Sequence, residues 1–372
     1  MNISVGIVGL PNVGKSTLFN ALLKKQQALA ANYPFATIDP NVGIVAVPDT
    51  RLSQLADVVK QEVHPSEAVG EGGPPLKPAT VEFYDIAGLV KGASEGAGLG
   101  NKFLSHIRET KVIAHVVRAF TDADVIREGS VDPSSDYKTI QTELILADLQ
   151  TVEKQRESKA VKTDPVKKSA VEKLYTALNA GSSAKDVALT DEEREAVKDL
   201  FLLSNKQEVV VLNVDEAEYT PGGMESAVKK YAALLGKSED GFVVICAKIE
   251  SEIAELSGEE QTEYLKELGL ETSGLERLIK KSYELLGLVS FLTAGAIEVK
   301  AWTIKKGSTA VQAAGEIHTD FMKRFIKAEV ISFEDYVTVG GRKKAREVGK
   351  ARLEGKDYIV QDGDVIEFKI GS

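Results

Sequence analysis

Glycines and a lysine near the start of the chain have the types and spacing that bind phosphate. The segment from Gly9 to Thr17 reads GLPNVGKST, which matches the pattern G-x-x-x-x-G-K-S/T. A glycine at each end of the pattern permits a tight turn whose backbone N–H groups converge on phosphate oxygens. The lysine would reach the β- and γ-phosphates, and the serine hydroxyl would bind Mg²⁺. The residues expected to hold a nucleoside triphosphate here are Asn12, Val13, Gly14, Lys15, Ser16 and Thr17.

The residues on either side of this segment have the local structure that a phosphate-binding loop needs. Residues 3–8 form an apolar, strand-like run, and residues 17–25 have the pattern of a helix. A helix that opens at Lys15 would direct the positive end of its dipole at the phosphates. The alternative is a glycine-rich turn that matches by chance, and the strand–loop–helix context argues against it.

Two later segments could complete a metal and phosphate site. Residues 32–41 contain two prolines and small polar residues, so they read as a loop, in which Thr37 could bind Mg²⁺ or serve only as a turn residue. The strand-like run 80–84 ends at Asp85, and Gly88 follows three residues later. A D-x-x-G match is weak by itself, but ligands bind at the carboxyl ends of strands in sheets of this kind. We expect Ser16, Thr37 and Asp85 to hold Mg²⁺, and Lys15 and the Gly88 N–H to act on the γ-phosphate.

A fourth segment, Asn213-Val214-Asp215-Glu216, follows a short buried strand and is expected to meet the base. Guanine-specific sites read N-K-x-D here, with the carboxylate accepting two N–H bonds from guanine. This chain has Val214 in place of the lysine and Glu216 in place of the aspartate, so the site is not built for guanine. Asn213, Val214 and Glu216 are therefore the expected base contacts, with ATP preferred over GTP. The alternative is an ordinary turn at the end of a strand.

Hydrolysis also needs a water molecule aligned with the γ-phosphate. Small GTPases place a glutamine directly after the D-x-x-G glycine, and this chain has Leu89, which cannot orient water by hydrogen bonding. We expect slow intrinsic turnover that a partner accelerates. Asn12 suggests K⁺ as a second cation beside the phosphates.

The rest of the sequence predicts how these segments are positioned. Strand and helix patterns alternate through residues 1–133 and again through 207–287, which predicts a nucleotide-binding domain in two parts. Residues 134–206 are helical in pattern and predict an inserted arm, a hairpin of long helices. Residues 288–372 predict a small α+β module in which Tyr336 and Val337 belong to a strand. Residues 61–78 read as a surface excursion.

The bulk properties exclude some classes of protein. The chain has 372 residues, a net charge of −10 and the single cysteine Cys246, which fits a reducing cytoplasm. No apolar run approaches the ~20 residues of a membrane span. The negative charge argues against general coating of nucleic acid, yet basic residues cluster near the C-terminus and predict an RNA-facing surface or a solvated face. They are Arg342, Lys343, Lys344, Arg346, Lys350 and Arg352.

Together, the phosphate-binding segment, Asp85-Ile86-Ala87-Gly88-Leu89-Val90-Lys91-Gly92-Ala93-Ser94 and Asn213-Val214-Asp215-Glu216 resemble the Obg-like ATPase, or YchF, family. The segment from Ala301 to Ala310 is similar to the opening of a TGS domain. The resemblance covers essentially the whole chain.

The resemblance implies an α/β fold: a P-loop NTPase domain, Ras-like with a mostly parallel sheet, an inserted helical (coiled-coil) arm and a C-terminal β-grasp-like TGS domain. It implies an ATPase that hydrolyses the β–γ anhydride and binds ribosomes, with the large subunit and ribosomal RNA as partners. We expect a cytoplasmic monomer without membrane contact. One departure concerns catalysis, because relatives often carry a histidine within the stretch that is Asp122 to Glu128 here. Arg127 falls near that place, and His115 reads as a structural residue in an apolar strand.

Two other functions remain open from the sequence. One is a GTPase of the same fold, which comparison of the two nucleotides in a binding assay distinguishes. The other is an interaction module that binds nucleotide without hydrolysing it, which the absence of turnover would favour.

Overall fold

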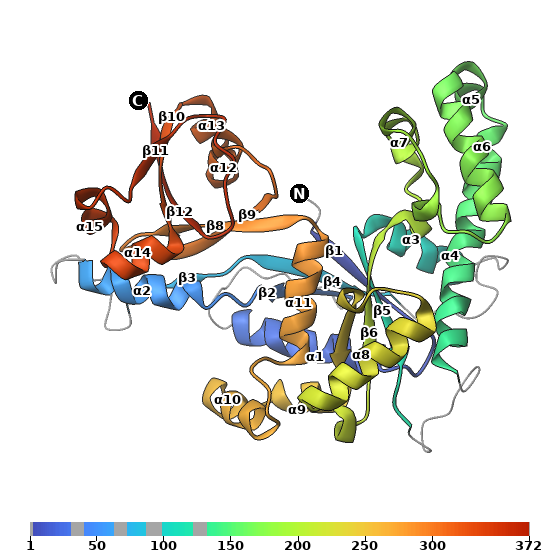
Figure 1. The fold of residues 1–372 in the computed structure, drawn as a ribbon, viewed down its shortest axis with the longest axis horizontal. Coiled ribbons are helices and arrows are strands. Elements are labelled where there is room, and N and C mark those ends of the chain that lie inside the picture. Colours follow the sequence, from blue (N-terminus) through green and yellow to red (C-terminus); the bar gives the residue numbers. More distant parts are fainter. Residues whose placement is uncertain (1–2, 31–40, 63–72, 87–98, 122–131, 372) are drawn as a thin grey trace. The chain divides into compact units, whose positions relative to one another are not determined.

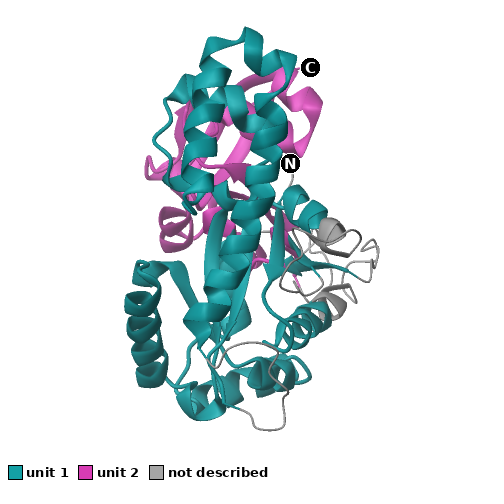
Figure 2. Ribbon diagram, turned by 90° about the vertical axis from the view of Figure 1, so that its right-hand side faces the viewer, with its two compact units in different colours: residues 1–45, 82–282 teal, residues 46–81, 283–372 magenta. Residues whose placement is uncertain are grey.

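The computed structural model describes residues 3–30, 41–62, 73–86, 99–121 and 132–371. The chain forms two compact units, each built from two separate stretches of sequence (Figure 2). Unit 1 comprises residues 1–45 and 82–282, and unit 2 comprises residues 46–81 and 283–372. The expected domain division at residues 133, 206 and 287 remains a prediction, but these units group residues 46–81 with the C-terminal residues.

Unit 1 contains a six-stranded sheet in the order β2-β4-β1-β5-β6-β7 (Figure 1). Pairing is parallel between β4 and β1, β1 and β5, β5 and β6, and β6 and β7. The bounds of the strands are β1 Ser4–Val8, β2 Val42–Ala46, β4 Thr80–Asp85, β5 Val112–Arg118, β6 Gln207–Asn213 and β7 Phe242–Ile245. The expected mostly parallel sheet is confirmed.

Burial along the strands follows from their place in the sheet. Every residue of β1 and β5 is buried, as expected for central strands covered on both faces. The border strand β2 instead alternates between half-buried and buried residues. The register pairs Val8 with His115, Arg118 with Asn213, and Asn213 with Ile245, so the carboxyl ends of the central strands lie along one edge of the sheet. That edge is where a ligand site is expected in this architecture.

Helices accompany the strands of this sheet, and others form the expected arm. The helices beside the sheet are α1 Lys15–Ala30, α3 Leu99–Glu109, α8 Pro221–Leu235, α9 Ala247–Ile253, α10 Gly258–Glu267 and α11 Gly274–Leu285. The arm contains α4 Pro133–Arg156, α5 Lys159–Thr163, α6 Pro165–Asn179 and α7 Asp191–Val197 (Figure 1). Each arm helix has a polar N-cap whose side chain accepts backbone N–H bonds: Asp132, Ser158, Asp164 and Thr190. Helix α6 packs against α4, α5 and α7, and these helices share an apolar core of their own.

Unit 2 is built on a mixed sheet in the order β11-β10-β12-β8-β9-β3. Its strands are β3 Leu76–Lys77, β8 Leu288–Ala294, β9 Val299–Lys305, β10 Phe325–Ser332, β11 Arg352–Glu354 and β12 Asp364–Ile370. Its helices are α2 Arg51–Glu62, α12 Ala310–Ile317, α13 Thr319–Lys323, α14 Phe333–Val339 and α15 Arg342–Glu347. Strands β12 and β8 pair in parallel, whereas β8 and β9 are antiparallel. Phe291, Val330 and Ile366 contribute to a core beneath α12.

Two features of unit 2 differ from the prediction. Residues 76–77, expected in a surface excursion, form β3 and pair with β9. Tyr336 and Val337, expected in a strand, lie in α14. The helix forms because Ser332 caps its N-terminus, accepting a bond from the Asp335 N–H at 3.1 Å, and Gly340 ends it in the left-handed conformation.

In the part of the chain that the structure describes, every helix is too short or too polar to cross a membrane.

Candidate functional site

The phosphate-binding segment forms the turn between β1 and α1, and its shape depends on residues that accept unusual backbone angles. Gly14 has φ +96°, and a Cβ there would lie 2.3 Å from Nδ2 of Asn213. Asn12 has φ +59°, a region that asparagine tolerates better than most residues do. At Gly9 a Cβ would lie 2.6 Å from the carbonyl oxygen of Val116. Glycine is therefore required at both ends of the turn by close approach of neighbouring atoms.

Lys15 begins α1 and is only 6% exposed. Its Nζ donates a hydrogen bond to the carbonyl oxygen of Leu10 at 2.6 Å. Burial lowers the pKa of Lys15 to about 8, and the nearby negative charge of Asp85 opposes that shift. Phosphate oxygens in the site would supply the negative charge that this buried cation needs. The position fits the role expected from the sequence.

Asp85 ends β4, one strand away from the phosphate loop. Its Oδ1 is buried and has no hydrogen-bond partner among the described residues. Burial raises the pKa of the Asp85 carboxyl, and Lys15 opposes the shift. A buried carboxylate oxygen with an unused lone pair fits a hydrated Mg²⁺. Thr37 and Gly88, also predicted for this part of the site, lie outside the described residues.

Ser16 supplies the other described oxygen expected near the metal, and its exposed side chain lines the site cavity. Within the described ranges no group of three or more acidic, histidine or cysteine side chains could hold a metal ion. At the usual Mg²⁺ site of nucleotide enzymes, one or two protein oxygens act together with phosphate and water oxygens. The donor set therefore fits Mg²⁺ only together with a bound nucleotide.

Asn213 connects the phosphate loop to the opposite side of the cavity. Its Nδ2 donates to the carbonyl oxygen of Val13 at 3.0 Å, and its Oδ1 accepts from the N–H of Ala247 at 2.9 Å. The side chain is 4% exposed, so both bonds are made in a buried setting. Asn213, which is expected to contact the base, therefore links the phosphate loop to the start of α9 through its two side-chain hydrogen bonds.

The three residues that follow Asn213 differ in the surroundings of their side chains. Val214 is 2% exposed and packs in an apolar cluster, while its N–H donates to the carbonyl oxygen of Ile245 at 2.9 Å. Asp215 accepts two bonds from Thr121, from the N–H at 3.0 Å and from the hydroxyl at 3.1 Å. Glu216 is exposed and forms an ion pair with Lys248. The sequence indicated Val214 and Glu216, but not Thr121 or Lys248.

These residues surround one cavity of about 860 Å³ in unit 1. The cavity is lined by Asn12, Gly14, Lys15, Ser16, Thr17, Phe120, Thr121, Asn213, Val214, Asp215, Glu216, Cys246, Ala247, Lys248, Ser251 and Glu252. The loop residues and the Asn213–Glu216 segment, predicted to act together, thus meet in one space. The residues that the prediction missed follow β5 and β7. The rule that ligands bind at strand ends could have identified them.

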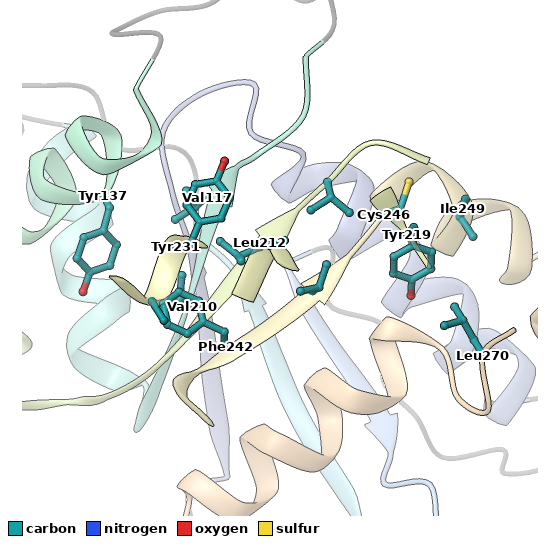
Figure 3. Packing of buried hydrophobic residues seen from close by; sticks show 14 of the residues in the cluster. Val117, Tyr137, Val210, Leu212, Tyr219, Tyr231, Phe242, Cys246, Ile249 and Leu270 are labelled. Carbon is teal, nitrogen blue, oxygen red and sulfur yellow. The ribbon is translucent and has the colours of Figure 1, made fainter. Parts of the chain in front are cut away.

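Buried hydrogen bonds hold the segment after Glu216 in place. The hydroxyl of Tyr219 donates to Oε1 of Glu250 at 2.5 Å, and Glu250 also accepts the N–H groups of Gly274 at 2.7 Å and Leu275 at 3.1 Å. Tyr219 and Cys246 belong to the same buried apolar cluster (Figure 3). This buried network holds the base-side loop, α9 and the start of α11 in one arrangement.

His115 lies in β5 and is 1% exposed. Its Nδ1 is 3.0 Å from Oε1 of Glu208, and its ring stacks on Tyr137 at 4.6 Å between centroids. The tyrosine hydroxyl donates to the same carboxylate at 2.8 Å. His115 thus joins the sheet to α4, in agreement with a structural role. Arg127 lies outside the described residues.

The basic cluster of unit 2 is mostly neutralised. Arg342 and Arg346 pair with Glu329 and Glu367, Lys350 pairs with Asp335, and Arg352 pairs with Glu354 and Asp364. Of the six residues, Lys343 and Lys344 are the two for which the described part of the chain shows no ion pair. The dense positive surface suggested by the sequence is therefore reduced to these two lysines.

Comparison with known proteins places the chain in a family. Residues 4–152 match the family described as "50S ribosome-binding GTPase", and residues 288–371 match the family YchF-GTPase_C, described as a protein of unknown function. The chain is 52% identical to the "Ribosome-binding ATPase YchF" of Bacillus subtilis and 49% identical to that of Haemophilus influenzae. Each alignment covers 99% of both chains.

A solved structure gives the same result at the level of the fold. The Schizosaccharomyces pombe YchF GTPase superimposes with a TM-score of 0.82 at 35% identity, covering 99% of this chain and 98% of that one. The similarity therefore extends through both compact units and the arm. Because close relatives match over their full length, the chain belongs to the YchF family.

Proposed function

We propose that the protein is a ribosome-binding ATPase that uses bound ATP and Mg²⁺ as a conformational switch. The observation that carries this proposal is the single cavity in which Lys15 and Ser16 meet the Asn213–Glu216 segment. A buried lysine at a helix start suits a triphosphate, and a base-side segment without the N-K-x-D pattern suits a base other than guanine. The relatives named ribosome-binding ATPases support the same activity and partner.

The choice of nucleotide rests on Val214 and Glu216. Val214 is packed in an apolar cluster where guanine-specific sites extend a lysine, and Glu216 is already paired with Lys248. Because an exposed ion pair contributes little free energy, the expected preference for ATP over GTP rests mainly on Val214. GTP remains the second candidate, because the fission-yeast relative is named a GTPase.

Isothermal titration with each nucleotide in the presence of Mg²⁺ tests the choice. ATP should bind at least tenfold more tightly than GTP, the scale expected when a site lacks the polar pair that rewards one base. Glu216→Asp with Val214→Lys should shift the preference toward GTP, with the melting temperature as a check on folding. Tighter binding of GTP by the wild-type chain would contradict the proposal.

Mg²⁺ would be held by Ser16 and, through water, by Asp85, with Thr37 as the third protein ligand. The ion would neutralise phosphate charge during attack on the β–γ bond. K⁺ beside Asn12 would be a second cation. The buried, unpartnered Oδ1 of Asp85 and the exposed Ser16 side chain support the first assignment.

For hydrolysis, Lys15 and the Gly88 N–H would stabilise charge on the γ-phosphate as ATP becomes ADP and phosphate. With Leu89 where other enzymes have glutamine, the isolated protein should turn over far more slowly than once per second. Purified ribosomes should raise that rate, and K⁺ should raise it further. A phosphate-release assay with and without ribosomes measures the effect, and rapid turnover that neither addition changes would contradict the switch.

The ribosomal partner also implies where the protein acts. We propose a cytoplasmic monomer of the Obg-like class whose contacts involve ribosomal RNA of the large subunit. The mixed sheet of unit 2, with β12 and β8 parallel at its centre and α12 against one face, supports a β-grasp-like TGS domain in residues 288–372. Residues 1–133 and 207–287 would form the nucleotide domain, and 134–206 the inserted arm.

A further inference from the structure

Phe201 has a backbone conformation that its residue type disfavours. It follows the short 3-10 turn Lys198–Leu200 and has φ +46° and ψ +48°. In the described part of the chain only Asn12 shares a positive φ without being glycine. For a bulky side chain the left-handed region costs about 1–2 kcal/mol, which glycine or asparagine would largely avoid.

The Phe201 side chain gains little from burial at this position. It is 57% exposed, whereas its neighbours Leu200 and Leu202 are 5% and 7% exposed and pack in the core of the arm. The left-handed turn lets both leucines point inward and leaves the ring between them outside. A polar residue or glycine would serve the turn equally well, so the fold gives no reason for an aromatic ring here.

The surrounding structure fixes the backbone that carries the ring. Arg108 of α3 donates to the carbonyl oxygens of Leu200 at 3.5 Å and Phe201 at 3.4 Å, and also to Oγ1 of Thr151 in α4 at 2.9 Å. Just after the ring, the buried Asp148 carboxylate accepts the N–H groups of Leu203 and Ser204, each at 2.7 Å. The backbone that presents the exposed ring is therefore fixed on both sides of Phe201.

Positive charge gathers beside this turn although the whole chain is acidic. The Lys206 ammonium donates to the carbonyl oxygen of Arg108 at 3.0 Å. It also donates to the carbonyl oxygen of Thr110, the residue before Lys111, so the three cations Arg108, Lys111 and Lys206 lie near one another. Burial lowers the pKa of Lys206 to about 8, with the charge of Lys111 adding to the shift, that of Asp148 opposing it and that of Arg108 adding to it. Asp148, the acid whose charge opposes them, is completely buried.

We propose that Phe201 is an RNA contact at the base of the arm, where its ring stacks on an unpaired base while Arg108, Lys111 and Lys206 attract the adjacent phosphates. An exposed aromatic ring beside cations is the usual platform for single-stranded nucleic acid. The inference deepens the proposed function, since ribosomal RNA offers unpaired bases in its loops. It is the chemistry of this patch, and not the overall charge, that favours RNA.

Binding of a fluorescein-labelled single-stranded RNA of about 10 nucleotides to the full-length chain tests the contact by fluorescence anisotropy. Phe201→Ala and Phe201→Leu should each weaken binding about tenfold, because stacking needs a ring. Phe201→Tyr should retain it. Lys111→Glu should also weaken binding and reduce its dependence on salt. Leu234→Ala, which truncates another exposed apolar side chain on α8, is the matched control and should have no effect.

Phe201→Asn separates a binding role from a structural one. Asparagine adopts the left-handed region more readily than phenylalanine, so the melting temperature should not fall while RNA affinity does. A fall in melting temperature with unchanged RNA affinity would overturn the proposal. ATP affinity should be unchanged in every Phe201 variant.

Co-sedimentation with purified ribosomes distinguishes this proposal from the wider function. The Phe201 variants should follow the same order with ribosomes as with the oligonucleotide. If Phe201→Leu binds ribosomes as well as wild type and Phe201→Ala does not, the ring enters an apolar protein pocket and the RNA contact is refuted. Failure of the wild-type chain to bind the oligonucleotide would also refute it. Failure to bind ribosomes, with oligonucleotide binding intact, would instead overturn the proposed function.

Discussion

The side-chain nitrogen of Asn213 donates a hydrogen bond to the carbonyl oxygen of Val13, which lies 200 residues earlier in the chain. The same side chain accepts a bond from the N–H of Ala247. One amide thus sets the distance between the phosphate loop and the base side of the cavity. Gly14 is confined by that amide as well, since any Cβ there would collide with its nitrogen.

Replacing Asn213 should therefore weaken nucleotide binding, because the phosphate loop loses its link to the base side of the cavity. Asn213→Ala leaves the Val13 carbonyl and the Ala247 N–H without their partners, at a cost of about 1–3 kcal/mol for each buried group. ATP affinity should fall about tenfold or more by isothermal titration, and the melting temperature should drop. Asn205→Ala, at an exposed asparagine of the arm, is the control. Unchanged ATP affinity would show that the two hydrogen bonds of the Asn213 side chain do not shape the site.

Lys15 should make ATP binding depend on pH. Its pKa in the free protein is about 8, below the usual 10.5. The folded state therefore binds fewer protons than the unfolded chain between these values, so the stability of the free protein should rise with pH there. A bound triphosphate favours the charged lysine, so ATP binding should take up a proton above about pH 8 and weaken as pH rises. Titrations near pH 9 in buffers of different ionisation enthalpy measure that uptake, which Lys15→Met should abolish together with tight binding.

Asp85 should destabilise the nucleotide-free protein, and Mg²⁺ should need it to strengthen ATP binding. Its carboxyl pKa is raised above 3.8 by burial, so the folded state holds the proton more tightly and stability is lost as pH rises through that window. Asp85→Asn should accordingly raise the melting temperature of the nucleotide-free protein. It should also remove most of the gain in ATP affinity that Mg²⁺ provides. The exposed Asp57→Asn serves as control, and a Mg²⁺ effect of wild-type size in Asp85→Asn would rule out the assignment.

In unit 2, Arg346 should act as a structural residue. Its guanidinium forms two bonds to the buried Glu329 carboxylate, at 2.8 and 2.9 Å, and together with Arg342 it lowers the pKa of that carboxyl. Because half of the Arg346 side chain is exposed, Arg346→Ala should reduce the free energy of unfolding by only about 1 kcal/mol. A lowered pKa means that this stability is present above pH 4.5 and lost below it, so the difference from wild type should shrink in acid. Urea unfolding measures both effects, with Lys344→Ala as the control.

The phosphate-binding part of the site could be predicted because its chemistry is local. Residues Asn12 to Thr17 are consecutive, and the turn between a buried strand and a helix is readable from spacing alone. Asp85 could be placed because its strand was recognisable and parallel strands end at a common edge. The base side was only partly predictable. Thr121 and Lys248 join the cavity through the pairing order of β5, β6 and β7, which the sequence does not state.

Unit 2 shows a second reason for failure. Leu76 and Lys77 form a strand only because β9, far along the chain, offers a free edge, and no local pattern in two residues can reveal that. In α14, by contrast, the cap at Ser332 and the glycine at 340 were local signals. The apolar Tyr336 and Val337 suggested a strand, and the capping residues determined the helix. Phe201 is a third case, since a left-handed aromatic residue contradicts every local preference.

The division of unit 2 into two stretches of sequence sets the order in which the protein can mature. Residues 46–81 leave the synthesising ribosome early, yet the strands β8 and β9 that complete their unit come after residue 282. Until then α2 and β3 lack a sheet to pack on, and their apolar side chains face water. Unit 1 ends at residue 282, so it can fold before the strands that complete unit 2 are made. A nascent chain that stalls in the arm would therefore carry an unpartnered apolar segment within its N-terminal half, which makes this stage the one most open to chaperones and proteases.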